Sequence, residues 1–296
     1  MFLFRIYRIA SPGSFSSITG CRTTQRRLLS HISVPVPRST ELEVESKFNV
    51  TALLRSRLDG RYPRNEHLNT SLAAATSLLK FTRQPDKLIN DQYFDDDDTL
   101  CSRGIWVRRR IERTLLSRDF PFQVPVKRSL EWEAKIRVGG DCQSSQFEEV
   151  VGEEAVMNLV KQHVSDLASL HKVVDINTLR KAWTVREHVE RALADREQRM
   201  MVVIDSSTAG GTVVRGPEEE SAFHHMVGEV ELTLDLELGE DGTKNVMAKR
   251  AAAELMKTEL DMFMKRNSSL FPTRPAPVGK LTAYFAWKQR QDDRLQ

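Results

Sequence analysis

Charged side chains recur at every second position in several short segments of this 296-residue chain. In ELEVESKF, Glu43, Glu45 and Lys47 alternate with apolar residues, and in VGEVELTL the acids Glu229 and Glu231 do the same. Side chains at alternate positions of a β-strand lie on one face, so each segment predicts a strand with one charged and one apolar face. Carboxylates grouped in this way can bind a divalent cation such as Mg²⁺.

Two other segments place cations on one face of a predicted strand. In GIWVRRR this face holds Trp106, Arg108 and Arg110. In WEAKIRV the charged face holds Glu133, Lys135 and Arg137. Arg and Lys side chains bind phosphate oxygens through charge-assisted hydrogen bonds. The acidic and basic strands together therefore predict a site for a phosphate compound with a bound metal.

Taken one at a time, these strands have a simpler explanation, in which the charged face is solvated and the apolar face lies inward. Acidic pairs on two strands and basic pairs on two others instead indicate an antiparallel sheet whose charged faces curl around one cavity. Burying about a dozen charges would cost more than the ~5–15 kcal/mol that stabilises a typical domain. The predicted cavity must therefore be hydrated and hold a ligand that neutralises both signs, such as a polyphosphate with a divalent metal.

The run from Glu43 to Lys47 is similar to the ExExK signature of the CYTH superfamily, the triphosphate tunnel metalloenzymes. Within it, the chain most resembles the thiamine triphosphatases. The matching segments, in chain order, are EVESKF, QYFD, IWVRRR, WEAK, FEEV, RKAW, VVID, VGEVE and PVGKLTAYF. They cover most of residues 42–286. The resemblance implies an α+β fold, a closed antiparallel β-barrel that forms a triphosphate tunnel with helices packed outside.

The resemblance also implies roles for individual residues. The residues expected to bind the triphosphate are Lys47, Arg108, Arg110, Lys135, Arg180 and Lys280. The residues expected to bind Mg²⁺ are Glu43, Glu45, Glu149, Asp205, Glu229 and Glu231, with Glu148 as an alternative to Glu149. Trp106 is expected to stack on the thiazolium ring of thiamine, because an indole face attracts a cation. Lys135 is expected either to act as a general base, if neighbouring cations lower its pKa, or only to bind phosphate.

The function implied is Mg²⁺-dependent hydrolysis of thiamine triphosphate to thiamine diphosphate and phosphate. Three alternatives remain open. They are an inorganic tripolyphosphatase, an adenylyl cyclase of class IV type that expels pyrophosphate, and a non-catalytic module that binds polyphosphate. One departure bears on the metal, since the resemblance implies Asp-x-Asp where this chain has Asp205-Ser206-Ser207. The missing carboxylate argues against a second tightly held metal ion.

The charges of the chain divide it into two unlike parts. The whole chain carries 44 Lys and Arg against 41 Asp and Glu, but the first 40 residues contain six of the arginines and no acid. An Arg- and Ser-rich segment without acids is typical of a mitochondrial transit peptide. We therefore expect a transit peptide over residues 1–33, a linker over 34–40, the CYTH-like domain over 41–290 and a tail over 291–296. The expected location is the mitochondrial matrix, or the cytoplasm if this segment has another role.

The composition also excludes several classes of partner. Beyond residue 40 the acids slightly outnumber the bases, which gives no support for binding nucleic acid. No apolar run reaches the roughly 18–20 residues that span a membrane. Three cysteines form neither a disulfide framework nor a metal cluster, which favours a reducing compartment. We expect a monomer whose partner is a small triphosphate, either thiamine triphosphate or tripolyphosphate.

Hydrophobic periodicity predicts the elements that position these residues. Strands are expected at 41–50, 91–95, 104–112, 131–138, 146–151, 200–205 and 225–238. Residues 168–199 are ambiguous, and 179–186 is their best strand candidate. Helices are expected at 68–81, 153–164 and 245–265. The acidic run at 95–98 predicts a solvated turn, because it lacks the ligand spacing of an EF-hand loop.

Overall fold

The computed structural model describes residues 39–60, 79–115, 128–141, 143–187, 199–209, 222–237 and 242–295. These ranges belong to one compact unit, Pro37–Gln296. The expected leader at 1–33, most of the linker and most of the helix expected at 68–81 lie outside the described residues. The strands of the described part are β1 (Ser39–Phe48), β2 (Leu79–Arg83), β3 (Lys87–Asp95), β4 (Ile105–Thr114), β5 (Arg128–Gly140), β6 (Ser144–Val151), β7 (His171–Glu187), β8 (Arg199–Ala209) and β9 (His224–Glu237).

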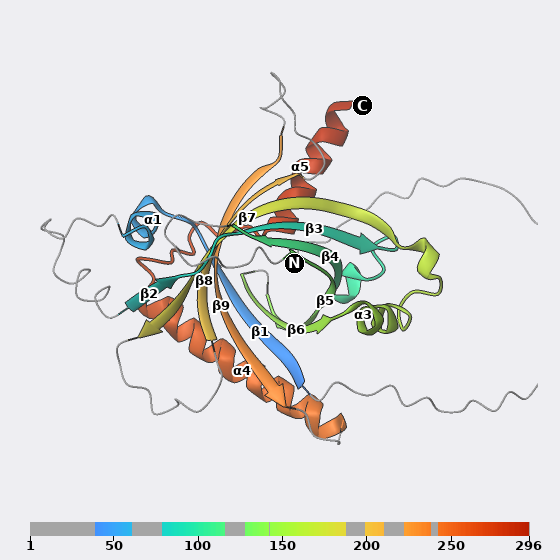
Figure 1. Ribbon diagram of the computed structural model, residues 1–296, viewed down its shortest axis with the longest axis horizontal. Helices are drawn as coiled ribbons and strands as arrows, with labels where there is room; N and C mark the ends of the chain where they lie inside the picture. The colour runs from blue at the N-terminus through green and yellow to red at the C-terminus, as the bar shows by residue number, and fades with distance from the viewer. Residues whose placement is uncertain are drawn as a thin grey trace, which may run out of the picture. The chain divides into compact units, whose positions relative to one another are not determined.

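Eight of these strands close an antiparallel β-barrel (Figure 1). Their order around the barrel is β7-β3-β4-β5-β6-β1-β9-β8, and β8 pairs back onto β7. β2 pairs with residues 183–187 of β7, while β3 pairs with residues 171–180 of the same strand. β2 therefore pairs with β7 beyond the end of β3, along the same edge of β7, and does not interrupt the ring of eight strands. This confirms the expected closed antiparallel barrel.

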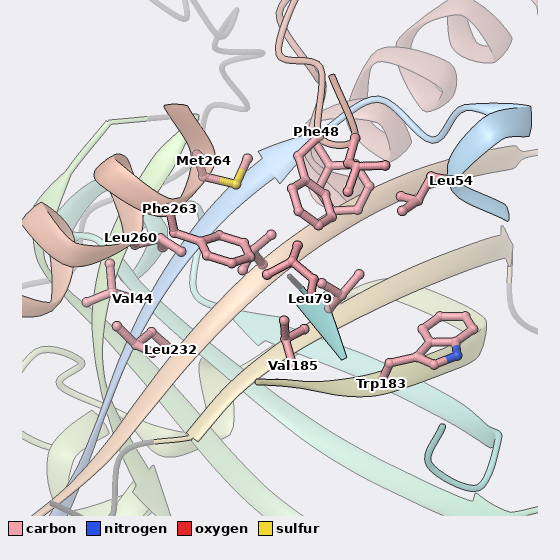
Figure 2. Close-up of a cluster of buried hydrophobic side chains, with 14 of the residues drawn as sticks. Val44, Phe48, Leu54, Leu79, Trp183, Val185, Leu232, Leu260, Phe263 and Met264 are labelled. Carbon is pink, nitrogen blue, oxygen red and sulfur yellow. The ribbon is translucent and has the colours of Figure 1, made fainter. Parts of the chain in front are cut away.

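The largest hydrophobic cluster lies between the barrel and α4 (Gly242–Arg266), which runs alongside β1 and β9 (Figure 1). Val44 and Leu232 face Leu260 and Phe263 of α4 in this cluster (Figure 2). The charged residues of β1 and β9 occupy the alternate positions of the same strands, so they point to the other side, into the barrel. Burial of the apolar face against α4 thus fixes which face of these strands lines the interior.

Three further helices lie around the barrel in the described residues. α3 (Glu153–Val160) covers β5 and β6 and buries Val156 and Val160 against them. α1 (Ala52–Leu58) contributes Leu54 and Leu58 to the cluster under α4. α5 (Lys280–Leu295) packs with residues from one end of the barrel interior, including Tyr93 and Ile176. None of the described helices combines the length and the apolar character needed to cross a membrane.

Several element boundaries differ from those predicted by periodicity. Residues 79–81, expected to end a helix, belong to strand β2. β7 runs over 17 residues, far beyond the strand expected at 179–186, and α5 covers 280–295, where no helix was expected. α3 ends at Val160 rather than at 164. β1 begins at Ser39, so the end of the expected linker is already strand.

Replacing Gly228 by alanine should destabilise the fold by about 1–3 kcal/mol, which is the usual cost of overpacking a core. Gly228 of β9 lies opposite Phe48 of β1, and a Cβ at Gly228 would lie 2.1 Å from Cε2 of Phe48. Phe48 cannot easily retreat, because it is fully buried and packs edge-on against Phe271. Thermal unfolding of Gly228→Ala measures the effect. The double variant Gly228→Ala/Phe48→Leu is the control, and strictly additive losses in it would contradict the clash.

Candidate functional site

Strand register determines which charged side chains share the barrel interior. Glu45 of β1 lies opposite Glu231 of β9, and Arg180 of β7 lies opposite Asp205 of β8. The faces of β1 and β9 that carry Val44 and Leu232 pack against α4, so the charged faces point inward. The interior of the barrel is therefore lined by charged side chains of both signs.

Six cations and eight carboxylates form ion pairs on this interior face, in two connected groups, the smaller of which consists of Lys135, Glu43 and Glu149. The cations are Lys47, Arg108, Arg110, Lys135, Arg180 and Lys280. The carboxylates are Glu43, Glu45, Asp91, Glu133, Glu149, Asp205, Glu229 and Glu231. Each of the six cations lies within 4.0 Å of at least one of these carboxylates. These ion pairs neutralise most of the charge that the barrel buries.

The acidic side of the interior is formed by β1 and β9. The Lys47 ammonium binds the Glu45 carboxylate and lies 3.8 Å from Glu229. Burial by itself would raise the pKa of Glu45, but Lys47 outweighs it and holds this pKa at about 2. Glu229 has the opposite shift, because burial and then the neighbouring Glu45 raise its pKa to about 7. This side therefore holds more carboxylates than its cations can neutralise.

Lys135 of β5 links this acidic side to β6. Its Nζ donates to Glu43 at 2.6 Å and lies 3.1 Å from Glu149. Burial would lower the pKa of Lys135, but Glu43 and Glu149 outweigh it and raise this pKa well above the ordinary value. Burial also raises the pKa of Glu43, with a further rise from Glu149, so Glu149 is the carboxylate that stays ionised beside Lys135.

The basic side of the interior is formed by β4 and is centred on Asp91 of β3. Arg110 donates to both carboxylate oxygens of Asp91, from Nε at 2.7 Å and from Nη2 at 3.0 Å. Arg108 donates from Nε to Glu133 at 2.8 Å and lies 3.9 Å from Asp91. Burial would raise the pKa of Asp91, but Arg110 and then Lys280 outweigh it and hold this pKa well below the ordinary value. Asp91 is fully buried and remains ionised.

Lys280, the first residue of α5, joins this network from the end of the barrel. Its Nζ donates to Asp91 at 3.2 Å and lies 4.0 Å from Asp205. Arg180 donates to both oxygens of Asp205 at 2.8 Å and also approaches Glu231 at 3.2 Å. Asp205 thus connects α5 with β7, and Arg180 extends the connection to β9. Residues separated by nearly the whole described chain meet in one interior network.

The structure places all the residues expected to bind phosphate or metal on this interior face. Glu149 lies inside, whereas Glu148 points outward and pairs with Lys249 of α4. Ser207, which stands where the resemblance implies a second acid, is buried in the interior and its Oγ shares a 3.0 Å hydrogen bond with Thr178. Trp106 lies at the end of the interior near α5, in a cluster with Tyr93 and Leu281.

Sequence reasoning missed the role of Asp91. It lies in LINDQYFD, where the neighbouring positions of the same strand face carry Ile89 and Tyr93 rather than further charges. Strand alternation alone therefore gave no signal of a charged face. The pairing of β3 with β4 places Asp91 directly opposite Arg110, and this pairing supplies the missing information. Glu133 was placed on the charged face of its strand, but its ion pair with Arg108 was not foreseen.

The acidic run at 95–98 forms a turn, as expected, but its first residue is buried. Asp95 accepts backbone hydrogen bonds from Asp96, Leu100 and Cys101 at 2.8–3.0 Å. Asp95, Asp98 and Cys101 bring potential metal-binding atoms within 4.8 Å of one another. Burial and the adjacent Asp95 raise the pKa of Cys101 to about 12, which keeps the thiol protonated. The hydrogen bonds of Asp95 explain this cluster as the support of a tight turn.

A metal ion fits the chemistry of the interior acids. Mg²⁺ prefers carboxylate oxygens, and the carboxylates of Glu43, Glu45, Glu229 and Glu231 share one face of β1 and β9. Like charges directly opposite each other in a sheet repel, as Glu45 and Glu231 do here. Burial and then the neighbouring Glu45 raise the pKa of Glu229 on the same face. A divalent cation at this position would relieve the repulsion.

Comparison with known proteins adds little to this geometry. No family model and no curated protein matches the chain. Among solved structures, the chain is similar to a protein from Hippeastrum that was studied as an adenylyl cyclase and is described as having dominant triphosphatase activity. The TM-score is 0.41 at 10% identity, and the match covers 84% of this chain and 96% of that one. A protein from Bacillus halodurans named as a candidate adenylate cyclase has a TM-score of 0.36, 13% identity and coverage of 77% and 91%.

A chain in the Mediator head module of Schizosaccharomyces pombe is similar to almost the same degree. Its TM-score is 0.34 at 8% identity, and the match covers 76% of this chain and 94% of that one. All three TM-scores are below 0.5, so these likenesses transfer neither a fold nor an activity. The barrel is established by its strand pairing.

Proposed function

We propose that this protein hydrolyses a phosphoanhydride bond of a triphosphate inside the barrel, with Mg²⁺ as the metal. The pairing of six cations with eight carboxylates on one buried face is the observation that supports this function. A metal–triphosphate complex carries both charges needed to replace these ion pairs. Cations that bind carboxylates can bind phosphate oxygens instead, and the released carboxylates can bind the metal.

Glu43, Glu45, Asp205, Glu229 and Glu231 are the residues that would hold Mg²⁺, directly or through water, with Glu149 beside them. The chemistry supplied by bound Mg²⁺ would be neutralisation of charge on the phosphate oxygens and orientation of the attacking water. Ser207 offers a hydroxyl bonded to Thr178 in place of a second acid, so we propose one tightly held metal ion.

The six paired cations would hold the triphosphate along the barrel. Each charge-assisted hydrogen bond to a phosphate oxygen contributes about 1.5–3 kcal/mol, and those that strengthen as charge develops lower the barrier. Lys135 belongs to this group, because its raised pKa keeps it protonated. A general base would need the opposite shift. We therefore assign phosphate binding rather than proton abstraction to Lys135.

Two substrates are proposed within this class. The resemblance to the thiamine triphosphatases supports thiamine triphosphate, with Trp106 stacked on the thiazolium ring. A structural observation favours the second, inorganic tripolyphosphate. The guanidinium of Arg137 already lies over the Trp106 ring, 5.4 Å from its centroid.

A panel of triphosphates assayed with Mg²⁺ tests the proposed function. Thiamine triphosphate, inorganic tripolyphosphate and ATP are incubated with the protein, and phosphate and pyrophosphate are measured separately. The proposal predicts phosphate release that depends on Mg²⁺ and stops when the metal is chelated. Release of pyrophosphate from ATP would support a cyclase instead. Tight binding of tripolyphosphate without turnover would support a binding module.

The affinity for Mg²⁺ should rise with pH, by about tenfold between pH 6 and pH 8, because binding must displace a proton from Glu229. The pKa of Glu229 is about 7, above its ordinary value of 4.5. Between pH 4.5 and pH 7 the Glu229 carboxyl is protonated in the folded state but ionised in the unfolded state. The stability that this bound proton contributes is therefore lost as the pH rises from 4.5 through 7. Mg²⁺ should consequently raise the melting temperature more at pH 8 than at pH 6.

Calorimetric titration with Mg²⁺ at both pH values measures this effect. Glu229→Gln is the control, since a glutamine does not titrate and its weaker metal binding should lose most of the pH dependence. Equal affinities of the unmodified protein at the two pH values would show that Glu229 does not contribute to the metal site.

A further inference from the structure

Trp106 and Arg137 form a stacked pair at the end of the barrel interior where α5 begins. Trp106 is on β4 and Arg137 on β5, and the guanidinium carbon lies 5.4 Å from the centre of the indole. Phe147 of β6 meets the same indole edge-on, with 5.7 Å between ring centroids. Leu281 of α5 belongs to the same apolar cluster as Trp106. The indole is therefore held in place by its neighbours and has a cation on its face.

Arg137 differs from the six interior cations in its partners. Each of those six lies within 4.0 Å of an interior carboxylate, whereas Arg137 has no carboxylate within that distance in the part of the chain that the structure describes. Its Nε atom is buried and has no hydrogen-bond partner among the described residues. Alternation along β5 places Arg137 on the same face as Glu133 and Lys135. A guanidinium that forms no ion pair within 4.0 Å among the described residues, although its charge helps to lower the pKa of Asp141, is suited to bind an anion.

This arrangement treats the two proposed substrates differently. A thiazolium ring that stacks on Trp106 would share one indole with the guanidinium of Arg137. Two positive charges that share one aromatic ring in a partly buried site repel each other, which should weaken binding by about tenfold or more. A phosphate group at the same place would instead accept hydrogen bonds from Arg137 and neutralise it. The stacked pair therefore favours an anionic end of the substrate.

We infer that Arg137 is a specificity residue that selects an all-phosphate chain, of the inorganic tripolyphosphate class, against a triphosphate that carries a cationic ring. The inference rests on the proposed function, because it concerns which triphosphate the same interior takes. Trp106 then serves as the support that fixes the guanidinium. Arg137 is then a seventh cation of the interior, in addition to the six that form ion pairs with interior carboxylates.

The affinities for tripolyphosphate and thiamine triphosphate, measured by calorimetry in the presence of a chelator, test this inference without turnover. The unmodified protein should bind tripolyphosphate about tenfold or more tightly than thiamine triphosphate. In Arg137→Gln the affinity for tripolyphosphate should fall by about tenfold or more, while that for thiamine triphosphate stays the same or rises. Arg137→Lys keeps the charge and should retain most of the preference.

Arg113→Gln is the matched control, since it removes an exposed arginine from β4 and should leave both affinities unchanged. Tighter binding of thiamine triphosphate by the unmodified protein would overturn the inference. An equal loss of both affinities in Arg137→Gln, together with a lower melting temperature, would also overturn it and show that Arg137 only covers Trp106. A separate hydrolysis assay of the unmodified protein distinguishes failure of this inference from failure of the proposed function. Preferential binding of tripolyphosphate without turnover would contradict only the proposed function.

Discussion

Replacing Arg110 by alanine should lower kcat/KM for the preferred triphosphate by about 100- to 1,000-fold, the usual loss when one donor to a developing anion is removed. Arg110 donates two hydrogen bonds to Asp91 and lies 3.6 Å from Glu133. Its forked guanidinium is suited to bind two phosphate oxygens at once. The substitution also leaves the fully buried Asp91 with Lys280 as its nearest cation. Activity and stability are therefore both expected to fall.

The two losses can be separated by measuring the melting temperature along with the kinetics. Arg110→Lys keeps the charge but loses the fork, and it should recover part of both activity and stability. Arg109→Ala is the matched control, because Arg109 lies on the opposite face of the same strand, beside Trp132. Near-wild-type turnover in folded Arg110→Ala would exclude Arg110 from substrate binding.

Replacing Glu45 by glutamine should lower kcat/KM at least about 100-fold and should also lower the melting temperature, because the lowered pKa of Glu45 means that its ionised carboxylate stabilises the folded protein at neutral pH. Glu45 is ionised, with a pKa of about 2, and lies opposite Glu231. The substitution removes the charge without changing the shape of the side chain. The substitution replaces the ion pair between Lys47 and Glu45 by a weaker neutral contact. It also removes the repulsion from Glu45 that helps to raise the pKa of Glu229.

The Mg²⁺ concentration needed for half-maximal activity should rise along with the loss of turnover in Glu45→Gln. Glu148→Gln is the matched control, since Glu148 is on the outer face of the same barrel and pairs with Lys249. A large loss of stability in Glu45→Gln, with activity per folded molecule unchanged, would mean that Glu45 has a structural role only.

Strand alternation predicted most of the barrel interior because charged and apolar residues separate onto two faces of β1, β5 and β9, and less sharply on β4, where Trp106 and Arg109 break the pattern. In ELEVESKF the apolar residues pack under α4, and the charged ones necessarily line the interior. That the charged faces point inward was predicted because some strands carry acidic pairs and others carry basic pairs. The resemblance then supplied Arg180, Asp205 and Lys280, which no periodicity singled out.

β7 and α5 could not be predicted in the same way. The interior face of β7 carries Ile176 and Thr178 before it reaches Arg180, and its outer face mixes Asp175 with Trp183. Neither face is uniformly apolar, so the strand shows no clear period. Asp91 was missed because its role depends on contacts with Arg110 and Lys280. Arg110 lies on another strand, and Lys280 lies on a helix nearly 190 positions further along the chain. Contacts between distant segments leave no signal in local spacing.

Hydrolysis inside the barrel is tested most directly by following inorganic tripolyphosphate by phosphorus NMR in the presence of the protein and Mg²⁺. We predict that the tripolyphosphate signals decay while those of diphosphate and phosphate grow in equal amounts, and that chelation of Mg²⁺ stops the reaction. Thiamine triphosphate, run in parallel, should be converted more slowly. Unchanged tripolyphosphate signals with folded protein and Mg²⁺ would contradict a hydrolytic site in the barrel.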